Sequence, residues 1–264
     1  MYYYIVDPQQ ISQQQFERVQ NILYSSLSEY KISGEVVRVT GLRTINQLVE
    51  NAFLRDVKTL VVVGSEETLH DVVNAIKGRA VVLGFIPLVP SELGKIFGIR
   101  DIESAVKIIA QRRIAELDLG MVNQVYFLTK LTFGLSNNPL KGIIPKLDYP
   151  EFDINFRVND QYRARLKTVG GEIINIQSDI GDGQLDVVLI PKLSNWSIFK
   201  NRKQLIRGNL ASLPNASVVH ANKIEMTGPV GLALKTFDRV LARAPVIVET
   251  IPKALKIIIS KVRS

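Results

Sequence analysis

A short apolar segment that turns through one glycine into a helix constrains the fold of this chain most strongly. Residues 59–63 (TLVVV) are β-branched or aliphatic, which is typical of a buried strand in a parallel sheet. Gly64 follows, and Val72, Val73 and Ile76 then have the spacing of one helix face. The segment predicts a strand, a tight turn and a helix N-terminus, whose free N–H groups and positive dipole end attract anions.

The residues of this turn are unusual for an anion-binding loop. Such loops are commonly rich in glycine, because glycine adopts positive φ without strain and lets a ligand approach the backbone. Here Gly64 is followed by Ser65, Glu66, Glu67 and Thr68. We expect Ser65 to cap the helix, and the helix dipole to stabilise each glutamate by about 0.3–1 kcal/mol. The sequence thus predicts a helix start that is capped by its own side chains.

Strand-like and helix-like segments alternate up to about residue 120. Two capping boxes, Ser12-x-x-Gln15 and Thr44-x-x-Gln47, each precede apolar residues at helical spacing and predict two helices. Strands are predicted at residues 3–6, 35–39, 59–63 and 80–85. This alternation predicts a parallel sheet with right-handed crossovers.

The pattern changes beyond this point. Strand-like segments follow one another without intervening helices, at residues 124–133, 152–158, 163–168, 172–177 and 185–190. Asn, Gly and Asp turns separate them, which predicts an antiparallel β-sandwich or barrel. One helix, at Ser194–Arg207, and a proline-containing connection, at Pro139–Pro150, are also expected here. We therefore predict an α/β domain of the parallel-sheet nucleotide type over residues 1–120, followed by an antiparallel β domain over residues 121–264.

A chain of 264 residues is long enough for two domains with substantial cores. It contains no cysteine, which excludes disulfides and thiolate chemistry and suits a reducing compartment. The N-terminus, MYYYIVDP, lacks the basic region of a signal peptide. The longest apolar stretch, residues 80–90, is shorter than the ~20 residues that span a bilayer. We expect a cytoplasmic protein.

Lysine and arginine exceed the acidic residues, 33 against 25, for a formal net charge of +8. This excess attracts anionic partners and arises in part from clusters at residues 112–113, 200–203 and 256–263. Solvated faces of a basic protein explain such clusters. The alternative is a peripheral contact with an anionic membrane, since acidic lipid attracts basic segments by ~1 kcal/mol per charge. Nucleic acid is not expected, because no basic stripe interleaves with stacking aromatics.

Six stretches of this chain resemble a known family in the same order. They are YYIVDPQQ, VVVGSEETLHDVVNAI, VVLGFIPLVPSELGKIFGI, DLGMVNQVYFLTKLTFGL, GDGQLDVVLIP and FDRVLARAPVIVETIPKALKIII. They resemble the diacylglycerol and sphingosine kinase family, whose fold is related to that of NAD kinases. The family's Gly-Gly-Asp-Gly-Thr loop corresponds to residues 64–68, and its second glycine loop begins at residue 86 with Ile-Pro-Leu.

The resemblance implies ATP and Mg²⁺ as cofactors and a lipid as substrate or ligand. It also implies that the last strands, near residues 246–259, return to the first domain. Glu66 takes the place of the family's loop aspartate, Asp238 that of the aspartate that accepts the lipid hydroxyl's proton, and Asp182 that of a structural Mg²⁺ ligand. The positions that correspond to the nucleotide contacts are Asp7, Gly64, Ser65, Glu67, Thr68, Ser91 and Glu92.

Both loops depart from the family's glycine pattern, and two interpretations of their activity follow. Glu66 and Glu67 would repel a triphosphate by ~4 kcal/mol at ~4 Å in a partly screened site. Ser91 and Glu92 repeat the serine–glutamate cap at the second loop. We therefore expect a pseudokinase with weak or no activity. The rival hypothesis is a working lipid kinase, in which Glu66 binds Mg²⁺ or the acceptor hydroxyl.

Two of the acidic residues also have plain structural interpretations. Asp238 fits a surface turn in which Arg239 pairs with it, and Asp182 fits an ordinary Asp-Gly hairpin turn. A third functional hypothesis is a non-catalytic module that binds a lipid or a protein partner. The sequence leaves these alternatives open.

Overall fold

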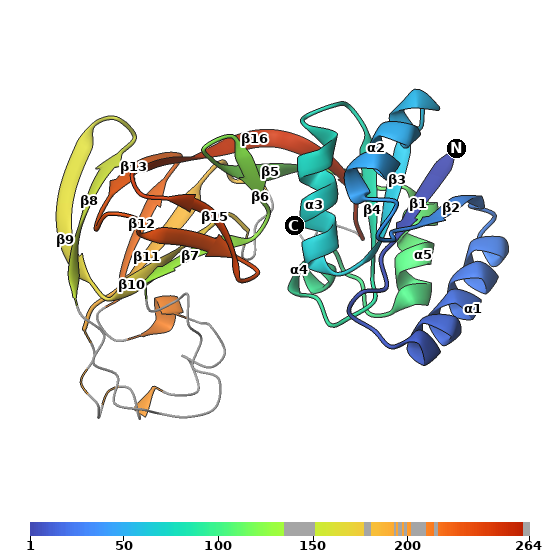
Figure 1. The fold of residues 1–264 in the computed structure, drawn as a ribbon, viewed down its shortest axis with the longest axis horizontal. Coiled ribbons are helices and arrows are strands. Elements are labelled where there is room, and N and C mark those ends of the chain that lie inside the picture. The colour runs from blue at the N-terminus through green and yellow to red at the C-terminus, as the bar shows by residue number, and fades with distance from the viewer. Residues whose placement is uncertain are drawn as a thin grey trace. The chain divides into compact units, whose positions relative to one another are not determined.

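The computed structural model describes residues 1–134, 151–176, 181–192, 194, 197, 200–201, 210–213 and 216–260. Contacts divide the chain into two units, Met1–Leu117 with Lys253–Ser264, and Asp118–Pro252. Helices and parallel strands make up the first unit, whereas strands dominate the described part of the second (Figure 1). The helix predicted at Ser194–Arg207 lies mostly outside the described residues, and the connection predicted at Pro139–Pro150 lies entirely outside them.

The first unit contains a parallel sheet in the strand order β2-β1-β3-β4-β16. Its strands are β1 (Tyr2–Val6), β2 (Gly34–Arg38), β3 (Thr59–Gly64), β4 (Val82–Pro87) and the end of β16 (Val246–Ile258). Every residue of β3 is buried, as an apolar run without alternation predicts. Lys256 and Ile257 of β16 pair with Val82 and Leu83 of β4. The predicted parallel sheet is confirmed.

The loops after β1, β3 and β4 leave the sheet side by side. Gly64 lies beside Pro87 in the strand register. The backbone N–H of Asp7 donates to the carbonyl of Val63 at 2.8 Å, and that of Leu88 donates to the carbonyl of Gly64 at 2.9 Å. The hydrogen-bond ladder thus continues past the strand ends and clamps the three loops together.

The described part of the first unit contains five helices: α1 (Gln13–Glu29), α2 (Ile45–Leu54), α3 (Glu66–Ile76), α4 (Glu92–Ile96) and α5 (Ile102–Gln111). Both predicted capping boxes are present, because Ser12 and Thr44 each accept a hydrogen bond from the backbone N–H three residues later. Helix α1 packs against α5, and α2 packs against α3. Together the two helix pairs cover the sheet.

The second unit contains two antiparallel sheets, in the orders β16-β13-β8-β9 and β12-β11-β10-β7-β14-β15. Their strands are β7 (Lys130–Gly134), β8 (Phe152–Val158), β9 (Tyr162–Thr168), β10 (Gly170–Ile174), β11 (Leu185–Ile190), β12 (Ser217–Ala221), β13 (Lys223–Thr227), β14 (Ala233–Thr236) and β15 (Arg239–Arg243). Strands β5 (Ile114–Val122) and β6 (Val125–Phe127) form a hairpin. A short 3₁₀ helix spans Leu210–Ser212.

One hydrophobic core joins residues of both sheets. Leu131 and Leu185 from one sheet pack in the same cluster as Ile154, Ile224 and Val248 from the other. This arrangement confirms the predicted antiparallel β-sandwich. Among the residues that the structure describes, every helix is too short or too polar to cross a membrane.

Two details of the second unit differ from the sequence-based expectation. The strand predicted over residues 124–133 is divided into β6 and β7. The carbonyl of Thr129 between them accepts hydrogen bonds from the N–H groups of Asn175 and Ile176, so the chain leaves one pairing and enters another. Strands β12, β13, β14 and β15 were not predicted, because they are short and rich in polar residues.

Candidate functional site

The candidate site is built from the start of helix α3 at the carboxyl edge of the parallel sheet. Ser65 Oγ accepts a hydrogen bond from the N–H of Thr68 at 3.2 Å, and Thr68 Oγ1 accepts one from the N–H of Ser65 at 3.3 Å. This reciprocal pair is a capping box. Both side chains are buried, with Ser65 at 7% and Thr68 at 3% exposure. The predicted N-cap role of Ser65 is confirmed.

Asp7, at the end of β1, joins this capping box. The hydroxyl of Thr68 donates to Asp7 Oδ2 at 2.8 Å, while Asp7 Oδ1 accepts from the N–H of Gln9 at 3.2 Å. A Cβ atom on Gly64 would lie 2.9 Å from Thr68 Oγ1. Glycine is therefore needed at position 64 because a larger side chain would collide with Thr68, whether or not a ligand binds to the loop.

Glu66 connects the start of α3 to the start of α4. Its Oε1 atom accepts hydrogen bonds from Ser91 Oγ at 2.6 Å and from the N–H of Leu93 at 2.9 Å. Ser91 is the N-cap of α4, and its Oγ accepts from the N–H of Gly94 at 2.8 Å. One carboxylate thus ties the two loops together, and the first turn of α4 has its N–H groups at Leu93 and Gly94 satisfied by side chains.

Glu67 and Glu92 make peripheral contacts. The amide of Gln10 donates to Glu67 Oε2 at 3.5 Å. Glu92 forms an ion pair with Lys95 at 2.5 Å, and its side chain is 80% exposed. The structure therefore links Asp7, Thr68 and Ser65 in one set of hydrogen bonds and Glu66 and Ser91 in another, and Gly64 lies next to Thr68.

Asp238 and Asp182 belong to the second unit. Asp238 lies in the two-residue turn between β14 and β15, where Phe237 has φ 48° and Asp238 has φ 65°, and its side chain is exposed. Asp182 Oδ1 accepts from the N–H of Gln184 at 3.0 Å, as in an ordinary turn before β11. Both residues therefore lie in turns, as their structural interpretation from the sequence predicts. The role of Asp238 as a base, the pairing with Arg239 and the role of Asp182 as a Mg²⁺ ligand stay predictions.

A buried polar cluster beside Asp182 was not identified from the sequence. Asp118 is 4% exposed, and its Oδ2 accepts from the N–H of Gly183 at 2.7 Å. The amide of Asn175 donates to the carbonyls of Asp118 and Leu128 at 3.0 and 2.9 Å, while its Oδ1 is buried and has no partner among the described residues. Asp118 begins a stretch that resembles the family, whereas nothing in the sequence around Asn175 predicts its contacts.

Comparison with known proteins gives this fold a context. Residues 166–259 match the family described as the YegS C-terminal NAD kinase beta sandwich-like domain. A solved structure of a candidate diacylglycerol kinase from Bacillus anthracis strain Sterne aligns with a TM-score of 0.81 and 15% identity, over 98% of this chain and 97% of that one. No curated protein sequence matches the chain significantly.

Two nucleotide kinases are also similar. An NAD kinase from Archaeoglobus fulgidus in complex with ATP aligns with a TM-score of 0.56 and 12% identity, over 98% of this chain and 93% of that one. Yeast NADH kinase complexed with NADH aligns with a TM-score of 0.57 and 10% identity, over 100% of this chain and 84% of that one. At these identities the similarity shows the fold alone. The chain therefore has the fold of the diacylglycerol kinases and NAD kinases, which confirms at that level the resemblance inferred from its sequence.

Proposed function

We propose that this chain is a diacylglycerol or sphingosine kinase-like protein whose nucleotide loops are closed by its own side chains, so that its kinase activity is weak or absent. The observation that carries the proposal is the pair of hydrogen bonds accepted by the Glu66 carboxylate from the second loop. A nucleotide's phosphates would need the same N–H groups.

The first argument concerns the hydrogen-bond donors. The N–H groups of Ser65, Thr68, Leu93 and Gly94 are all bonded to side-chain oxygens of the protein. The N–H of Leu93 donates to a carboxylate, and breaking such a hydrogen bond costs about 1.5–3 kcal/mol, which a phosphate must offset before it gains any affinity.

The second argument concerns charge. Asp7 and Glu66 place two carboxylates at the edge of the sheet where the phosphates would lie. Each would repel a phosphate oxygen by ~4 kcal/mol at ~4 Å in a partly screened site. The residues at these loops therefore do not fit ATP, and no phosphoryl-transfer step through it is derived.

Calorimetric titration with ATP and Mg²⁺ tests this proposal on the full chain. We expect no saturable heat at micromolar ATP, and the Archaeoglobus fulgidus NAD kinase, solved in complex with ATP, is the positive control. A phosphate-transfer assay with diacylglycerol and with a long-chain base completes the test. Micromolar ATP binding or phosphate transfer to either lipid would overturn the proposal. In that case Glu66→Ala and Asp238→Asn should each abolish turnover, as the rival hypothesis of a working kinase requires.

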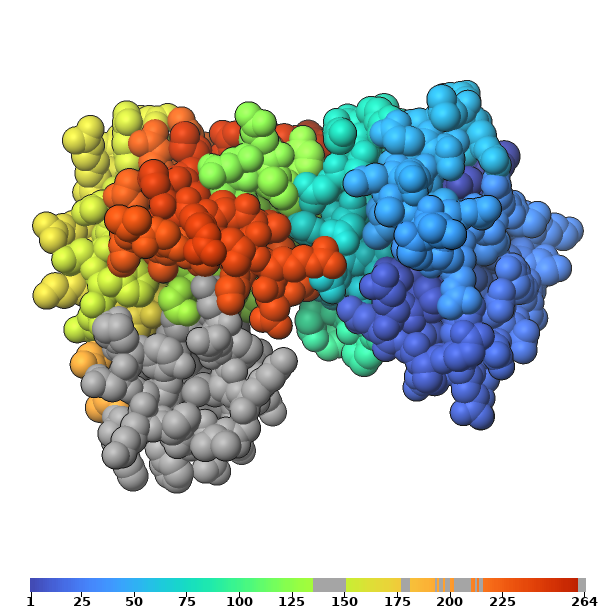
Figure 2. Space-filling view, viewed as in Figure 1, coloured from blue at the N-terminus to red at the C-terminus, as the bar shows by residue number. Residues whose placement is uncertain are grey.

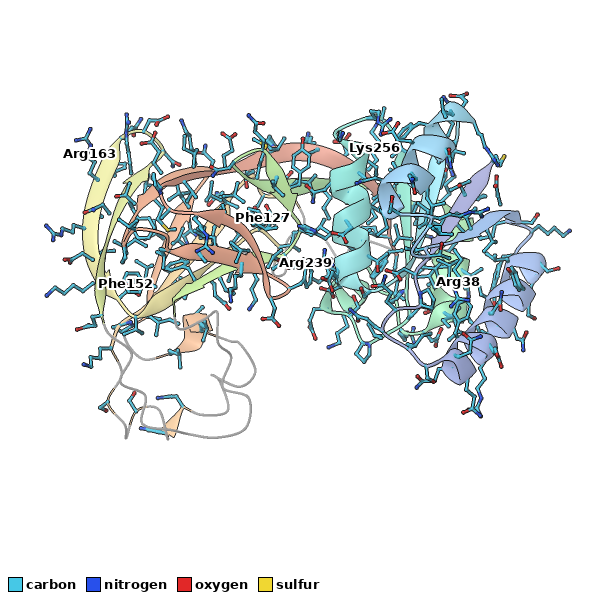
Figure 3. All side chains as sticks on the ribbon, viewed as in Figure 1. Arg38, Phe127, Phe152, Arg163, Arg239 and Lys256 are labelled. Atoms are coloured by element: carbon cyan, nitrogen blue, oxygen red, sulfur yellow. The ribbon has the colours of Figure 1, made fainter. Side chains whose placement is uncertain are left out.

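A specific surface supports a second candidate function, docking on anionic lipid. Among the described strands, β9 lies at the edge of its sheet and pairs only with β8. Arg163, Arg165 and Lys167 alternate along it and are exposed, and Tyr162 is 70% exposed. Figure 2 shows the segment of β8 and β9, in yellow, at the surface, and Figure 3 shows Arg163 on it. Arg165 pairs with Asp153 at 2.8 Å. Lys167 lies opposite Asp153 in the strand register and its charge helps to lower the pKa of that carboxyl, whereas Arg163 forms no ion pair with any residue that the structure describes.

Three cations of β9 thus face one acid, Asp153, and the positive charge that remains fits a surface of acidic headgroups. At ~1 kcal/mol per charge, removing two of these cations should weaken vesicle binding by about 30-fold. The test is co-sedimentation with phosphatidylglycerol vesicles, comparing Arg163→Gln/Lys167→Gln with Lys107→Gln, an exposed cation on α5. We expect only the double variant to lose binding. Binding that ignores anionic lipid content and salt, or equal loss in both variants, would contradict this function.

A further inference from the structure

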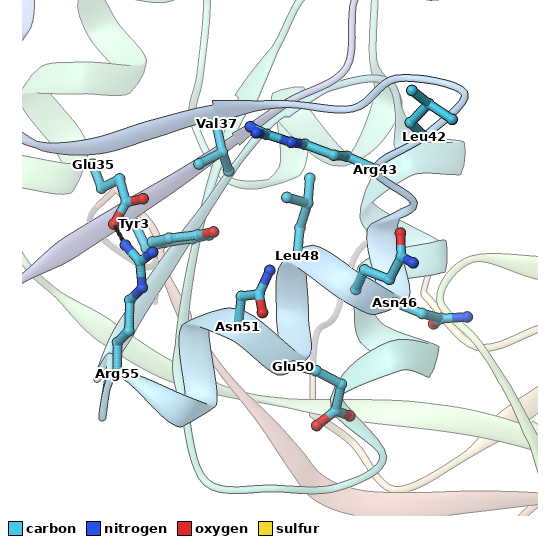
Figure 4. A pocket seen from close by; sticks show the side chains of 11 residues that line it. Tyr3, Glu35, Val37, Leu42, Arg43, Asn46, Leu48, Glu50, Asn51 and Arg55 are labelled. Atoms are coloured by element: carbon cyan, nitrogen blue, oxygen red, sulfur yellow. Dashed lines mark hydrogen bonds and ion pairs between the residues drawn. The ribbon is translucent and has the colours of Figure 1, made fainter.

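A second feature of the first unit lies away from the loops described above. A pocket of about 580 Å³ opens between strand β2, at the edge of the parallel sheet, and helix α2. Its sheet side is formed by Tyr3, Glu35 and Val37, and its helix side includes Leu48 and Asn51 (Figure 4). This volume falls within the ~300–1,000 Å³ that is usual for small-molecule sites.

The carboxylates of this pocket are already neutralised. Glu35 forms an ion pair with Arg55. Glu50 accepts a bidentate pair of hydrogen bonds from Arg79, at 2.7 and 3.0 Å, and the Arg79 guanidinium lowers the pKa of Glu50. Both acids are therefore occupied by protein cations, and neither adds net negative charge to the pocket.

Four other polar groups of this pocket are not bonded to the part of the chain that the structure describes. The hydroxyl of Tyr3, the guanidinium of Arg43 and the side-chain amides of Asn46 and Asn51 make no hydrogen bond or ion pair with any residue that the structure describes. Figure 4 shows the Tyr3 hydroxyl, the Asn51 amide and the Arg43 guanidinium around the aliphatic side chains of Val37 and Leu48. One positive charge and several neutral donors thus surround a small apolar patch.

Two of these groups are held in place by their surroundings. The backbone of Arg43 is fixed by paired hydrogen bonds with Thr40, both at 3.1 Å, and its N–H also lies 3.1 Å from Thr40 Oγ1. The Tyr3 residue as a whole is 1% exposed. Burial, and then the charge of Glu35, raise the pKa of the Tyr3 hydroxyl, which therefore stays neutral and able to donate. The pocket is presented by ordered elements, which favours recognition of a defined ligand.

We propose that this pocket binds a small hydroxylated organic anion, either a sugar acid or a sugar phosphate. The guanidinium of Arg43 matches a carboxylate or phosphate, which it can bind through two parallel hydrogen bonds. The Tyr3 hydroxyl and the Asn51 amide can each donate to or accept from ligand hydroxyls. Val37 and Leu48 supply the apolar contact for the C–H face of such a molecule. The inference is independent of the kinase-like function, because no residue of the α3 and α4 loops lines the pocket.

The test is calorimetry together with NMR titration of the full chain, using gluconate, glucose 6-phosphate and uncharged glucose as probes. We expect saturable millimolar or tighter binding of at least one anion and none of glucose. Gluconate alone would identify a carboxylate site, and glucose 6-phosphate alone a phosphate site. The perturbed amides should lie in residues 34–55.

Matched variants separate this site from general attraction of anions. Arg43→Gln should weaken binding about 10–100-fold, the effect of losing a charge-assisted hydrogen bond. Asn51→Leu should weaken anion binding less than Arg43→Gln does. The side chains of Arg43 and Asn51 are both exposed, so neither variant should disturb the fold. The control is Arg38→Gln, which removes an exposed guanidinium that lies over the Phe16 ring beside α1, outside the pocket. Failure of both anions to bind, or equal loss in Arg43→Gln and Arg38→Gln, would overturn the proposal.

Discussion

Replacing Glu66 by alanine tests whether this carboxylate holds the two loops together. Its Oε1 atom accepts two hydrogen bonds, at 2.6 Å from Ser91 and 2.9 Å from Leu93. Hydrogen bonds to charged groups contribute about 1.5–3 kcal/mol each. Glu66 is half-buried, so solvent screens part of this energy. We expect Glu66→Ala to lower the free energy of unfolding of the first unit by about 2–3 kcal/mol.

Two companion variants separate this contact from other effects. Glu67→Ala removes an acid from the same helical turn, and we expect a cost of only about 0.3–1 kcal/mol from the helix dipole. Glu66→Gln keeps an acceptor of the same shape without the charge. Because neutral hydrogen bonds are roughly half as strong, its cost should be about half that of Glu66→Ala.

Native-state hydrogen exchange is the most direct assay, with urea unfolding monitored by circular dichroism beside it. In Glu66→Ala the amide of Leu93 should exchange about 30-fold faster, which corresponds to ~2 kcal/mol, while amides of β3 serve as the internal reference. The reasoning is refuted if Glu66→Ala costs no more than Glu67→Ala and the Leu93 amide exchanges at the wild-type rate.

Three further changes have defined outcomes. Gly64→Ala should cost about 1–3 kcal/mol in urea unfolding, because the new Cβ would lie 2.9 Å from Thr68 Oγ1; a stability unchanged from wild type would contradict this. Burial raises the pKa of Glu172 above its ordinary value of 4.5, although Lys130 opposes the shift. The folded state therefore binds the Glu172 proton more tightly than the unfolded state, so the wild-type protein should lose stability as the pH rises from 4.5 through the folded pKa. Thermal melts of Glu172→Gln should not show this loss of stability. Asp238→Gly should stabilise by about 1 kcal/mol in thermal melts, because glycine adopts the positive φ of this turn without strain; destabilisation would argue against that strain.

Local signals in the sequence predicted the parts of the structure that depend on near neighbours. The β3 strand is an apolar run, and Ser12, Thr44 and Ser65 each cap a helix through contacts only three residues away. The β-sandwich was predicted from successive strand-like segments and the Asn, Gly and Asp turns between them. Such features need no knowledge of which segments meet in space, so the sequence contains them directly.

Contacts between distant segments could not be predicted in this way. Glu66 reaches Ser91 because β3 and β4 are adjacent and end in register, which no helical or strand periodicity specifies. The same holds for Thr68 and Asp7, which lie 61 residues apart. The pocket beside α2 exists because β2 is the edge of the sheet, and the sequence predicted the strand without its place in the order.

The link between Glu66 and the start of α4 makes two turns, whose partners are 25 residues apart, into one structural element. Exchanging only the first turn for a glycine-rich sequence would free the Leu93 amide and loosen the second turn before any anion site was complete. Engineering a nucleotide-binding site into this protein must therefore replace both turns at once. Replacing the residues one at a time would pass through variants that are less stable than the present protein.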